Sequence, residues 1–234
     1  MQLSKLEYLA ISKLNKNNFV VFRIRDICLL LNIKKTKAYN LVKALKKKSA
    51  IKKAGKGFFT LKNMNEFIIA SAINYPSYIS FWSALNYYGW SDQNPKKIFL
   101  AATKYSKEIN DFKYITVSKK RFFGYILEGD ITIAEKEKAI IDSLLFPKYA
   151  GGIKEITANL KLAFNSLNKE KLISYALKIE SKAVVRRLGF ILEQLSYKKI
   201  DKLRKHIGRG YERLDPSLKK KNNLNKKWLL DINW

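Results

Sequence analysis

Three carboxylates close together in the sequence are the first candidates for catalysis. Glu135, Glu137 and Asp142 all fall within AEKEKAIIDSLL, where a short strand is expected to pass into a helix. A carboxylate cluster can hold Mg²⁺ for phosphoryl transfer. Here the carboxylates alternate with Lys136 and Lys138, which favours a solvated helix face on which Asp142 pairs with a neighbouring lysine. We therefore expect neither a catalytic site nor a metal or other cofactor at these residues.

The two other residue types that often do chemistry occur once each. His206 lies in the basic segment DKLRKHIGRG, without a serine or cysteine nucleophile signature, and is expected at the surface. Cys28 falls on an apolar helix stripe and is expected to be a small core residue. A single cysteine excludes a disulfide framework and a multi-cysteine zinc site. The residues therefore do not predict an enzyme.

The chemistry that the sequence favours is electrostatic. The chain of 234 residues has a net charge of +28, which implies an anionic partner such as nucleic acid or a membrane surface. A lysine-rich proteome would make every surface somewhat basic, but the charge is concentrated. Residues 1–63 carry 16 Lys and Arg against 2 acidic residues, and the other 171 residues carry 31 against 17, so each part contributes +14. Residues 34–61 contain ten lysines and no acidic residue.

The apolar residues of this basic stretch show that it is folded. Those spaced at i, i+3, i+4 and i+7 are Ala38, Leu41, Val42 and Leu45. This spacing predicts an amphipathic helix with one buried stripe. The same spacing predicts a helix from Ile24 to Leu31. Ser4 and Glu7 form a capping box that predicts a first helix ending near Leu14.

A hairpin is expected after the third helix. FVVF (19–22) reads as a short β-prone link, and IKK and FFTL flank AGKG within residues 51–61. Gly55 and Gly57 are expected to supply the positive φ of a tight turn. Three helices followed by a hairpin predict a winged helix-turn-helix domain over residues 1–62. GKG is not a phosphate-binding loop, because it lacks the GxxxxGK[ST] pattern.

In a winged helix-turn-helix the third helix enters the major groove of DNA and the hairpin tip contacts the backbone or the minor groove. Lysines near the helix start are expected on phosphates. Thr36, Tyr39 and Asn40 are expected at base edges, because asparagine is suited to adenine. The predicted DNA-binding residues are Arg23, Arg25, Lys34, Lys35, Thr36, Lys37, Tyr39, Asn40, Lys43, Lys52, Lys53 and Lys56.

Residues 63–234 predict a second, larger mixed α/β domain, so the fold class is α+β. The expected helices cover 64–73, 77–89, the end of AEKEKAIIDSLLF, ITANLKLAF, LISYALKI and AVVRRLGFILEQL. The expected strands are 98–103, 114–118, 121–127, a short one at the start of ITIAEKEKAIIDSLLF and one within KKWLLDINW. The start, MQLSKLEYLA, lacks the apolar core of a signal peptide, and no run reaches 18 apolar residues. We expect a soluble cytoplasmic protein without a membrane partner.

The whole chain resembles the AbiEi antitoxins of type IV toxin–antitoxin and abortive-infection systems. Beside the N-terminal pattern, the resemblance rests on YPSYISFWSALNYYG (75–89), NPKKIFLAAT, RFFGY, AEKEKAIIDSLL, YAGG, RRLGFILEQL and WLLDIN, in this order and spacing. Each piece alone is weak, and the winged helix alone is shared by many regulators.

The resemblance implies that the protein represses its own operon by binding repeats upstream of its gene. It also implies that the protein counters a neighbouring nucleotidyltransferase-like toxin without a stable complex. The resemblance also implies a second basic surface, for which the candidate residues are Lys119, Lys120, Arg121, Arg186 and Arg187. Because Arg186 and Arg187 flank an apolar stripe, at least one of them is a candidate to pair within the fold instead. The chain is richer in lysine than the family pattern, and lysine specifies bases less well than arginine.

Two other functions stay open at this point. One is a winged-helix regulator whose second domain senses a small ligand. The other is an enzyme that processes nucleic acid at the carboxylate helix. The neighbouring gene and metal-dependent turnover of nucleic acid would separate these readings.

Overall fold

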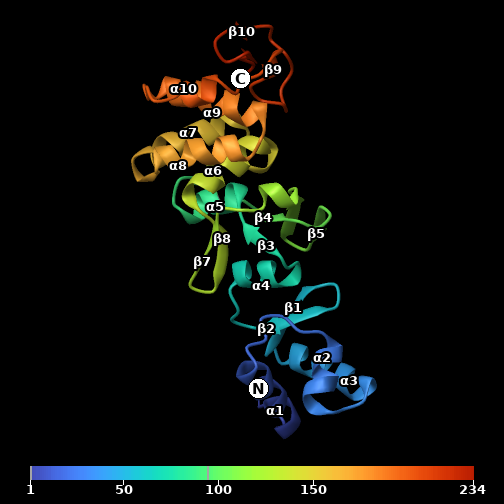
Figure 1. Cartoon of the computed structure of the whole chain (residues 1–234). Helices are drawn as coiled ribbons and strands as arrows, with labels where there is room; N and C mark the ends of the chain where they lie inside the picture. The colour runs from blue at the N-terminus through green and yellow to red at the C-terminus, as the bar shows by residue number, and fades with distance from the viewer. Residues whose placement is uncertain (1, 94) are drawn as a thin grey trace.

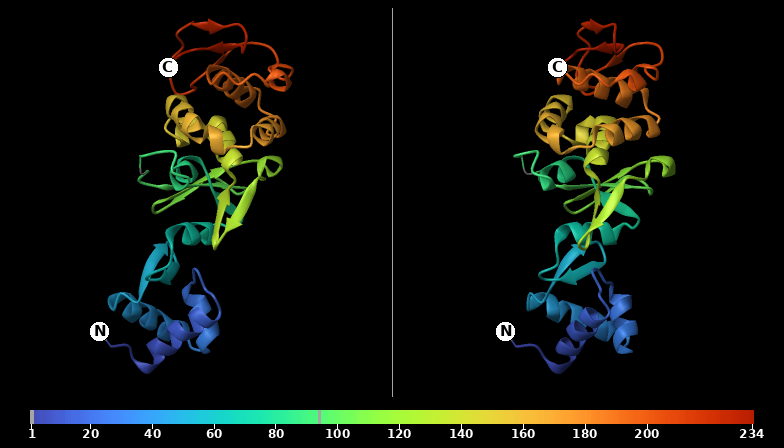
Figure 2. Two further views of the ribbon diagram at one scale, coloured as in Figure 1. Left: turned by 90° about the vertical axis from the view of Figure 1, so that its left-hand side faces the viewer. Right: turned by 60° about the vertical axis from the view of Figure 1, so that its left-hand side comes forward.

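The structure is a computed structural model that describes residues 2–93 and 95–234. It is an elongated protein with its two termini at opposite ends (Figure 1). From the N-terminal end the chain builds three helices and a hairpin, then a six-stranded sheet, then a layer of helices and a small three-stranded sheet (Figure 2). The predicted α+β class is confirmed.

The N-terminal elements follow the sequence pattern. They are α1 (Lys5–Lys16), α2 (Ile24–Leu31), α3 (Lys35–Lys47), β1 (Ile51–Gly55) and β2 (Phe58–Leu61). The capping box at α1 is present: the Ser4 amide donates to Glu7 Oε2 at 2.6 Å, and the Glu7 amide donates to Ser4 Oγ at 3.3 Å. All four residues of the predicted α3 stripe are buried, so the helix packs as its spacing indicates.

The hairpin β1–β2 is tied to both halves of the chain. Phe22 and Phe59 exchange two backbone hydrogen bonds of 2.8 Å, so the predicted β-prone link adds a single bridge to the hairpin. Of the two hairpin glycines, Gly57 has a left-handed φ, of 79°, and Gly55 does not. The prediction for Gly55 is wrong: this position has no room for a side chain, since a Cβ would lie 2.6 Å from Ile109 Cγ2.

The central sheet has the strand order β5-β6-β4-β3-β8-β7. Its strands are β3 (Ser77–Ile79), β4 (Ile98–Ala102), β5 (Lys107–Ile109), β6 (Phe112–Thr116), β7 (Tyr125–Glu128) and β8 (Ile131–Ala134). β3 pairs antiparallel with β4 and parallel with β8. A helix was expected at 77–89, but its first residues form this strand and only Phe81–Tyr87 is helical (α5). Periodicity alone does not separate a short buried strand from a buried helix.

The first half of the predicted strand 121–127 is also different. Lys119–Arg121 forms a 3₁₀ turn (η1), and the strand begins only at Tyr125. The remaining helices are α4 (Glu66–Ile73), α6 (Lys136–Leu145), α7 (Ile153–Ala163), α8 (Lys169–Lys178), α9 (Lys182–Gln194) and α10 (Asp201–Arg204), with 3₁₀ turns η2 (Pro147–Tyr149) and η3 (Phe164–Ser166). The C-terminal sheet joins β9 (Glu212–Arg213), β10 (Leu224–Asn225) and β11 (Leu230–Asp231), and β11 is the predicted last strand.

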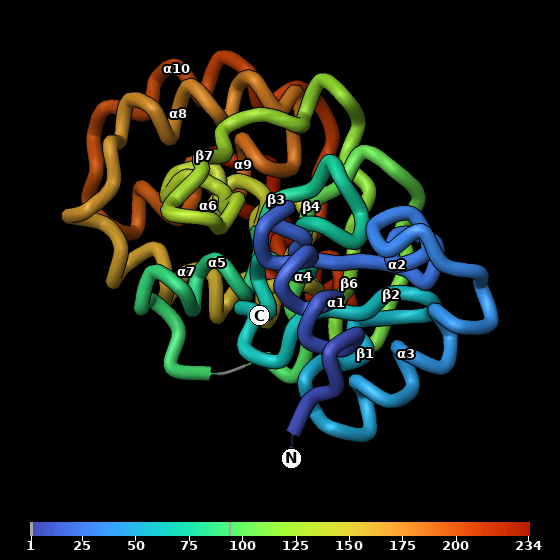
Figure 3. Tube along the Cα trace, turned by 90° about the horizontal axis from the view of Figure 1, so that it is seen from below, coloured from blue at the N-terminus to red at the C-terminus, as the bar shows by residue number. Residues whose placement is uncertain are grey.

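The buried apolar residues form two clusters. The smaller one lies among α1, α2 and α3, which face the viewer in Figure 3, and includes Ile51; the larger one fills the sheet and the C-terminal helices. The hairpin belongs to both, because Ala54 is part of the larger cluster and Phe58 packs against it. One face of the hairpin, which precedes the predicted boundary after residue 62, therefore lies against the second part of the chain. Across residues 2–93 and 95–234, the helices are too short or too polar to cross a membrane.

Candidate nucleic-acid interface

The exposed face of α3 is built by the helix repeat. Each residue turns about 100° around the axis, so residues at i, i+4, i+7 and i+11 share a face. Opposite the buried stripe this places Thr36, Asn40, Lys43 and Lys47, all exposed. Tyr39 is also exposed, at 56%, but it lies on the flank of this face.

The charges on this face are not neutralised within the protein. The exposed lysines of α3 and its N-cap are Lys34, Lys35, Lys37, Lys43, Lys46 and Lys47. Among the described residues, no carboxylate oxygen lies within 4.0 Å of their ammonium groups. Lys48 differs, because its ammonium lies 2.6 Å from Glu7 Oε2. The hydrogen bond from Lys48, with those from Ser4, lowers the pKa of Glu7. α3 therefore presents cations that are free to meet an external anion.

A hollow opens at the start of α3. Its lining includes Asn32, Ile33, Lys34, Thr36, Lys37 and Asn40. Asn32 ends α2 in a left-handed conformation with a φ of 50°, which turns the chain directly into α3. The structure thus brings four of the predicted DNA-binding residues together around one concave surface.

The remaining predicted contacts lie on α2 and the hairpin. Arg25, Lys53 and Lys56 are exposed, and Lys56 stands beside Gly57 at the hairpin turn. Arg23 is also exposed, and its guanidinium lies over the Phe58 ring, 4.2 Å from the centroid. Lys52 is half-buried and lies 3.4 Å from a carboxylate oxygen of Glu66. Lys52 is consequently the weakest of these candidates for an external contact.

Two further lysines lie on the exposed face that the helix repeat predicts, but they are not among the predicted DNA-binding residues. Lys46 and Lys47 lie in the last turn of α3 and are exposed. Lys47 is eleven residues after Thr36 and continues the central row of the face. Both are therefore additional candidates for contacts with DNA.

The second basic surface predicted from the resemblance does not form as a unit. Lys119 is exposed, but Lys120 is paired with Glu180. Arg121 is half-buried, and its Nε donates to the Ile179 carbonyl at 2.9 Å. Only Lys119 of these three is free of such contacts among the described residues.

Arg186 and Arg187 are core residues, so their assignment to a surface is wrong. They are 1% and 5% exposed on α9, which is covered by neighbouring elements. Arg186 donates to the carbonyls of Ile207 and Arg209, at 2.7 and 2.9 Å. Arg187 donates to the carbonyls of Leu214 and Leu144, at 2.9 and 2.8 Å. A guanidinium has five N–H donors on one planar group, so each arginine can bind several carbonyls at once, and α9 thereby holds the C-terminal loops.

The three carboxylates considered for catalysis do not form one cluster: Glu135 and Glu137 both lie within 4.0 Å of the Lys171 ammonium, whereas Asp142 has other partners. Glu135 accepts from Lys171 at 2.9 Å, and Glu137 accepts from the Asn168 amide at 2.8 Å. The predicted solvated face is wrong, because residues 137–144 of α6 are all buried. Residues 2–93 and 95–234 contain no group of three His, Cys, Asp or Glu side chains that could hold a metal.

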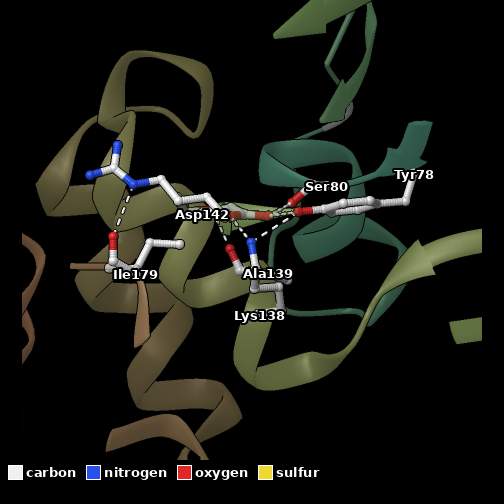
Figure 4. A network of polar contacts seen from close by, with 8 residues as sticks. Tyr78, Ser80, Lys138, Ala139, Asp142 and Ile179 are labelled. Carbon is white, nitrogen blue, oxygen red and sulfur yellow. Dashed lines mark hydrogen bonds and ion pairs between the residues drawn. The ribbon is translucent and has the colours of Figure 1, made fainter. Parts of the chain in front are cut away.

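Asp142 is the centre of a buried polar network (Figure 4). It pairs with Lys138, as the sequence predicted, and accepts hydrogen bonds from Tyr78 Oη at 3.0 Å and Ser80 Oγ at 2.8 Å. Lys138 also donates to Tyr78 Oη at 2.9 Å. Burial and the Asp142 charge raise the pKa of Tyr78 well above its ordinary value, so its hydroxyl stays protonated. The network joins α6 to β3, and these internal contacts indicate a structural role.

The two single residues lie outside any such cluster. His206 is exposed, as predicted, and its Nδ1 lies 2.8 Å from the Lys202 carbonyl. Cys28 is half-buried and packs against the smaller core. Neither position adds a reactive group to the α3 face.

No family model matches the chain, and no curated protein matches it. Its fold is similar to that of solved structures, among them the crystal structure of the RV2827C protein from Mycobacterium tuberculosis. The TM-score is 0.63 at 11% sequence identity, over 98% of this chain and 92% of that chain. The similarity shows that both proteins share a fold across nearly their whole length.

Proposed function

We propose that this protein binds double-stranded DNA through a winged helix-turn-helix formed by α1, α2, α3 and the hairpin. The observation that carries the proposal is the exposed face of α3, whose lysines have no carboxylate partner among the described residues. A row of unpaired cations at helical spacing fits the phosphates on both sides of a major groove.

The position of each residue on α3 assigns its role. Thr36 and Asn40 lie opposite the buried stripe near the start of α3 and point most directly into the groove, so they read base edges. Lys35 and Lys37 on the two flanks, and Lys43 farther along the helix, contact phosphates. Tyr39 lies on a flank too, which favours a backbone contact over the base contact expected from its residue type.

The resemblance to AbiEi antitoxins supports a proposal for the role of the protein in the cell. The protein acts in the cytoplasm as antitoxin and autorepressor of a type IV toxin–antitoxin operon. It binds repeats upstream of its own gene and counters a nucleotidyltransferase-like toxin encoded beside it, without a stable complex. The buried network at Asp142 and the buried arginines of α9 are consistent with a second part that is structural rather than catalytic.

A competition assay tests DNA recognition. The full chain is titrated with the duplex from just upstream of the gene, at physiological salt, against random duplex. We expect specific binding to be at least ~10³-fold tighter. Equal affinity for both duplexes would contradict the proposal that the protein recognises a specific operator sequence.

A second assay tests the toxin. The neighbouring gene is co-expressed with the full chain from a foreign promoter, and growth is measured. Rescue is expected for the wild type and for a Lys35→Ala, Lys37→Ala, Lys43→Ala variant, while the variant loses repression of its own promoter. Loss of rescue in the folded triple variant would show that the antitoxin activity depends on the DNA-binding face.

A further inference from the structure

The hairpin β1–β2, the wing of the proposed DNA-binding domain, is held by two different parts of the chain. β2 is held by the N-terminal part, where Thr60 Oγ1 donates to the Val20 carbonyl at 2.7 Å. The end of β1 is held by the second part, where Gly55 meets Ile109 at the end of β5. In Figure 1 the wing lies between the N-terminal helices and the central sheet, on the same side as β5.

A β-bulge in β1 lies at the contact with β5. The pairing with β2 moves from Lys53 directly to Gly55, so Ala54 has no partner residue in the ladder. A bulge bends its strand and changes the direction of the chain that follows. Here that chain is the turn with Lys56, the exposed cation at the tip of the wing. The bulge therefore helps to set where the Lys56 ammonium lies.

Asn110 binds the bulge. Its Nδ2 donates to the Ala54 carbonyl at 3.1 Å. Ala54 is 5% exposed, and a buried carbonyl outside a strand ladder needs a partner. Asn110 is the first of the two residues that connect β5 to β6, and it has a left-handed φ of 51°, which asparagine adopts readily. The turn alone would explain an asparagine, but it does not explain why the amide reaches out of the turn to β1.

Gly55 allows β1 to approach this turn closely. A Cβ at Gly55 would lie 2.6 Å from Ile109 Cγ2, so any larger residue would push the two strands apart. The φ of Gly55 is not left-handed, so its backbone does not require glycine. The glycine therefore serves the contact between the wing and β5 and not the conformation of the hairpin.

We propose that the β5–β6 turn positions the wing for DNA, with Asn110 as the positioning residue that fixes the bulge at Ala54 and, through it, Lys56. This inference rests on the proposed DNA binding. It goes beyond that proposal because it makes a DNA contact of the first part of the chain depend on the second part. Asn110 acts through Lys56 and is not itself a DNA contact. A single hydrogen bond contributes modestly to folding, so its loss is expected to displace the wing without unfolding the protein.

Fluorescence anisotropy of the full chain on the upstream duplex tests the inference. Lys56→Ala removes one phosphate contact and should weaken binding about fivefold at ~0.15 M salt, since one contact contributes about 0.9 to the salt slope. Asn110→Gly accepts the left-handed φ but lacks the amide, and it should weaken binding by about twofold to fivefold through the same contact. The matched control is Asn222→Gly, which should bind like the wild type. Asn222 is exposed, has a left-handed φ of 58° and lies beside β10 at the far end of the molecule (Figure 1).

Double variants separate positioning from a general loss of stability. Asn110→Gly should add nothing to the effect of Lys56→Ala, because both remove the same contact, but it should add its full effect to that of Lys43→Ala on α3. Gly55→Ala should weaken binding as Asn110→Gly does. Adding Ile109→Ala to Gly55→Ala removes the methyl group that the new Cβ would meet, and it should restore binding.

The outcomes distinguish this inference from the proposed function. A wild type that does not bind the duplex contradicts DNA binding and the inference together. If the wild type binds, the inference alone is overturned by wild-type affinity in Lys56→Ala or Asn110→Gly, by equal losses in Asn110→Gly and Asn222→Gly, or by losses of Asn110→Gly and Lys56→Ala that add. In each of these cases DNA binding by α3 stands.

Discussion

Removing three charges from α3 should weaken DNA binding far more than removing three charges elsewhere. Lys35, Lys37 and Lys43 are exposed and have no carboxylate within 4.0 Å among the described residues. Each is therefore free to displace a counterion from a phosphate, which contributes about 0.9 to the slope of log K against log salt. Three lost contacts lower the slope by about 2.7. At ~0.15 M salt this corresponds to about 2.2 decades of affinity, or about 3 kcal/mol.

The assay is fluorescence anisotropy of the full chain on the upstream duplex, repeated over a series of salt concentrations. The control variant removes Lys219, Lys220 and Lys226, which are equally exposed but lie in the loops around β10 at the far end of the molecule (Figure 1). Both variants lower the net charge by three, so they reduce the long-range attraction to DNA equally and differ only in where the charges are removed. We expect the control to keep the wild-type slope to within about one contact.

Equal losses in the two variants would refute the reasoning. They would mean that binding is spread over all lysines of a basic protein, and that the unpaired row on α3 has no special part. A loss confined to the α3 variant, with the wild-type slope in the control, requires a local site.

Three further outcomes follow from the contacts of single residues. Asn40→Ala should remove about 1–3 kcal/mol of discrimination at particular base pairs, whereas Tyr39→Ala should weaken all duplexes alike, as measured with a panel of base-pair substitutions. Asp142→Ala leaves the buried ammonium of Lys138 unpaired and should cost about 3–5 kcal/mol of unfolding free energy in urea, most of which Asp142→Leu with Lys138→Met recovers. The pKa of Glu7 is lowered in the folded state, so ionised Glu7 stabilises the protein at pH values above 4.5, its ordinary pKa. This stabilisation is lost as the pH falls through the folded pKa, and Glu7→Gln should remove this part of the pH dependence of urea unfolding.

The N-terminal part could be predicted because its residues follow local rules. The capping box at Ser4 and the apolar stripes of α2 and α3 specify helices without reference to the rest of the chain. The exposed face of α3 then follows from the same helix repeat. Gly55 was misread, because its small size serves a contact with Ile109, fifty-four residues away.

The second part was harder to predict because its elements are buried on several sides. β3 lies between β4 and β8, and its residues show no polar alternation that would mark a strand. Arg186 and Arg187 have the composition of a basic surface, but backbone carbonyls of distant loops take up their donors. Charge alone did not reveal burial in this case, because the hydrogen-bond partners of both guanidinium groups are backbone carbonyls, which the sequence does not mark; a carboxylate oxygen, of Glu212, lies 3.8 Å from Arg186 Nη1.

The hairpin β1–β2 connects these two kinds of structure. Ile51 belongs to the smaller core, while Ala54 belongs to the larger one and its carbonyl accepts from Asn110 Nδ2 at 3.1 Å. Cutting the chain after residue 62 would expose Ala54 and Phe58 to water and remove that hydrogen bond. An isolated N-terminal part keeps the α3 face but loses the support of its hairpin, so residues 1–62 should be less stable than the same residues in the full chain. The position of the hairpin tip relative to α3 is accordingly set in part by β5, which carries Ile109.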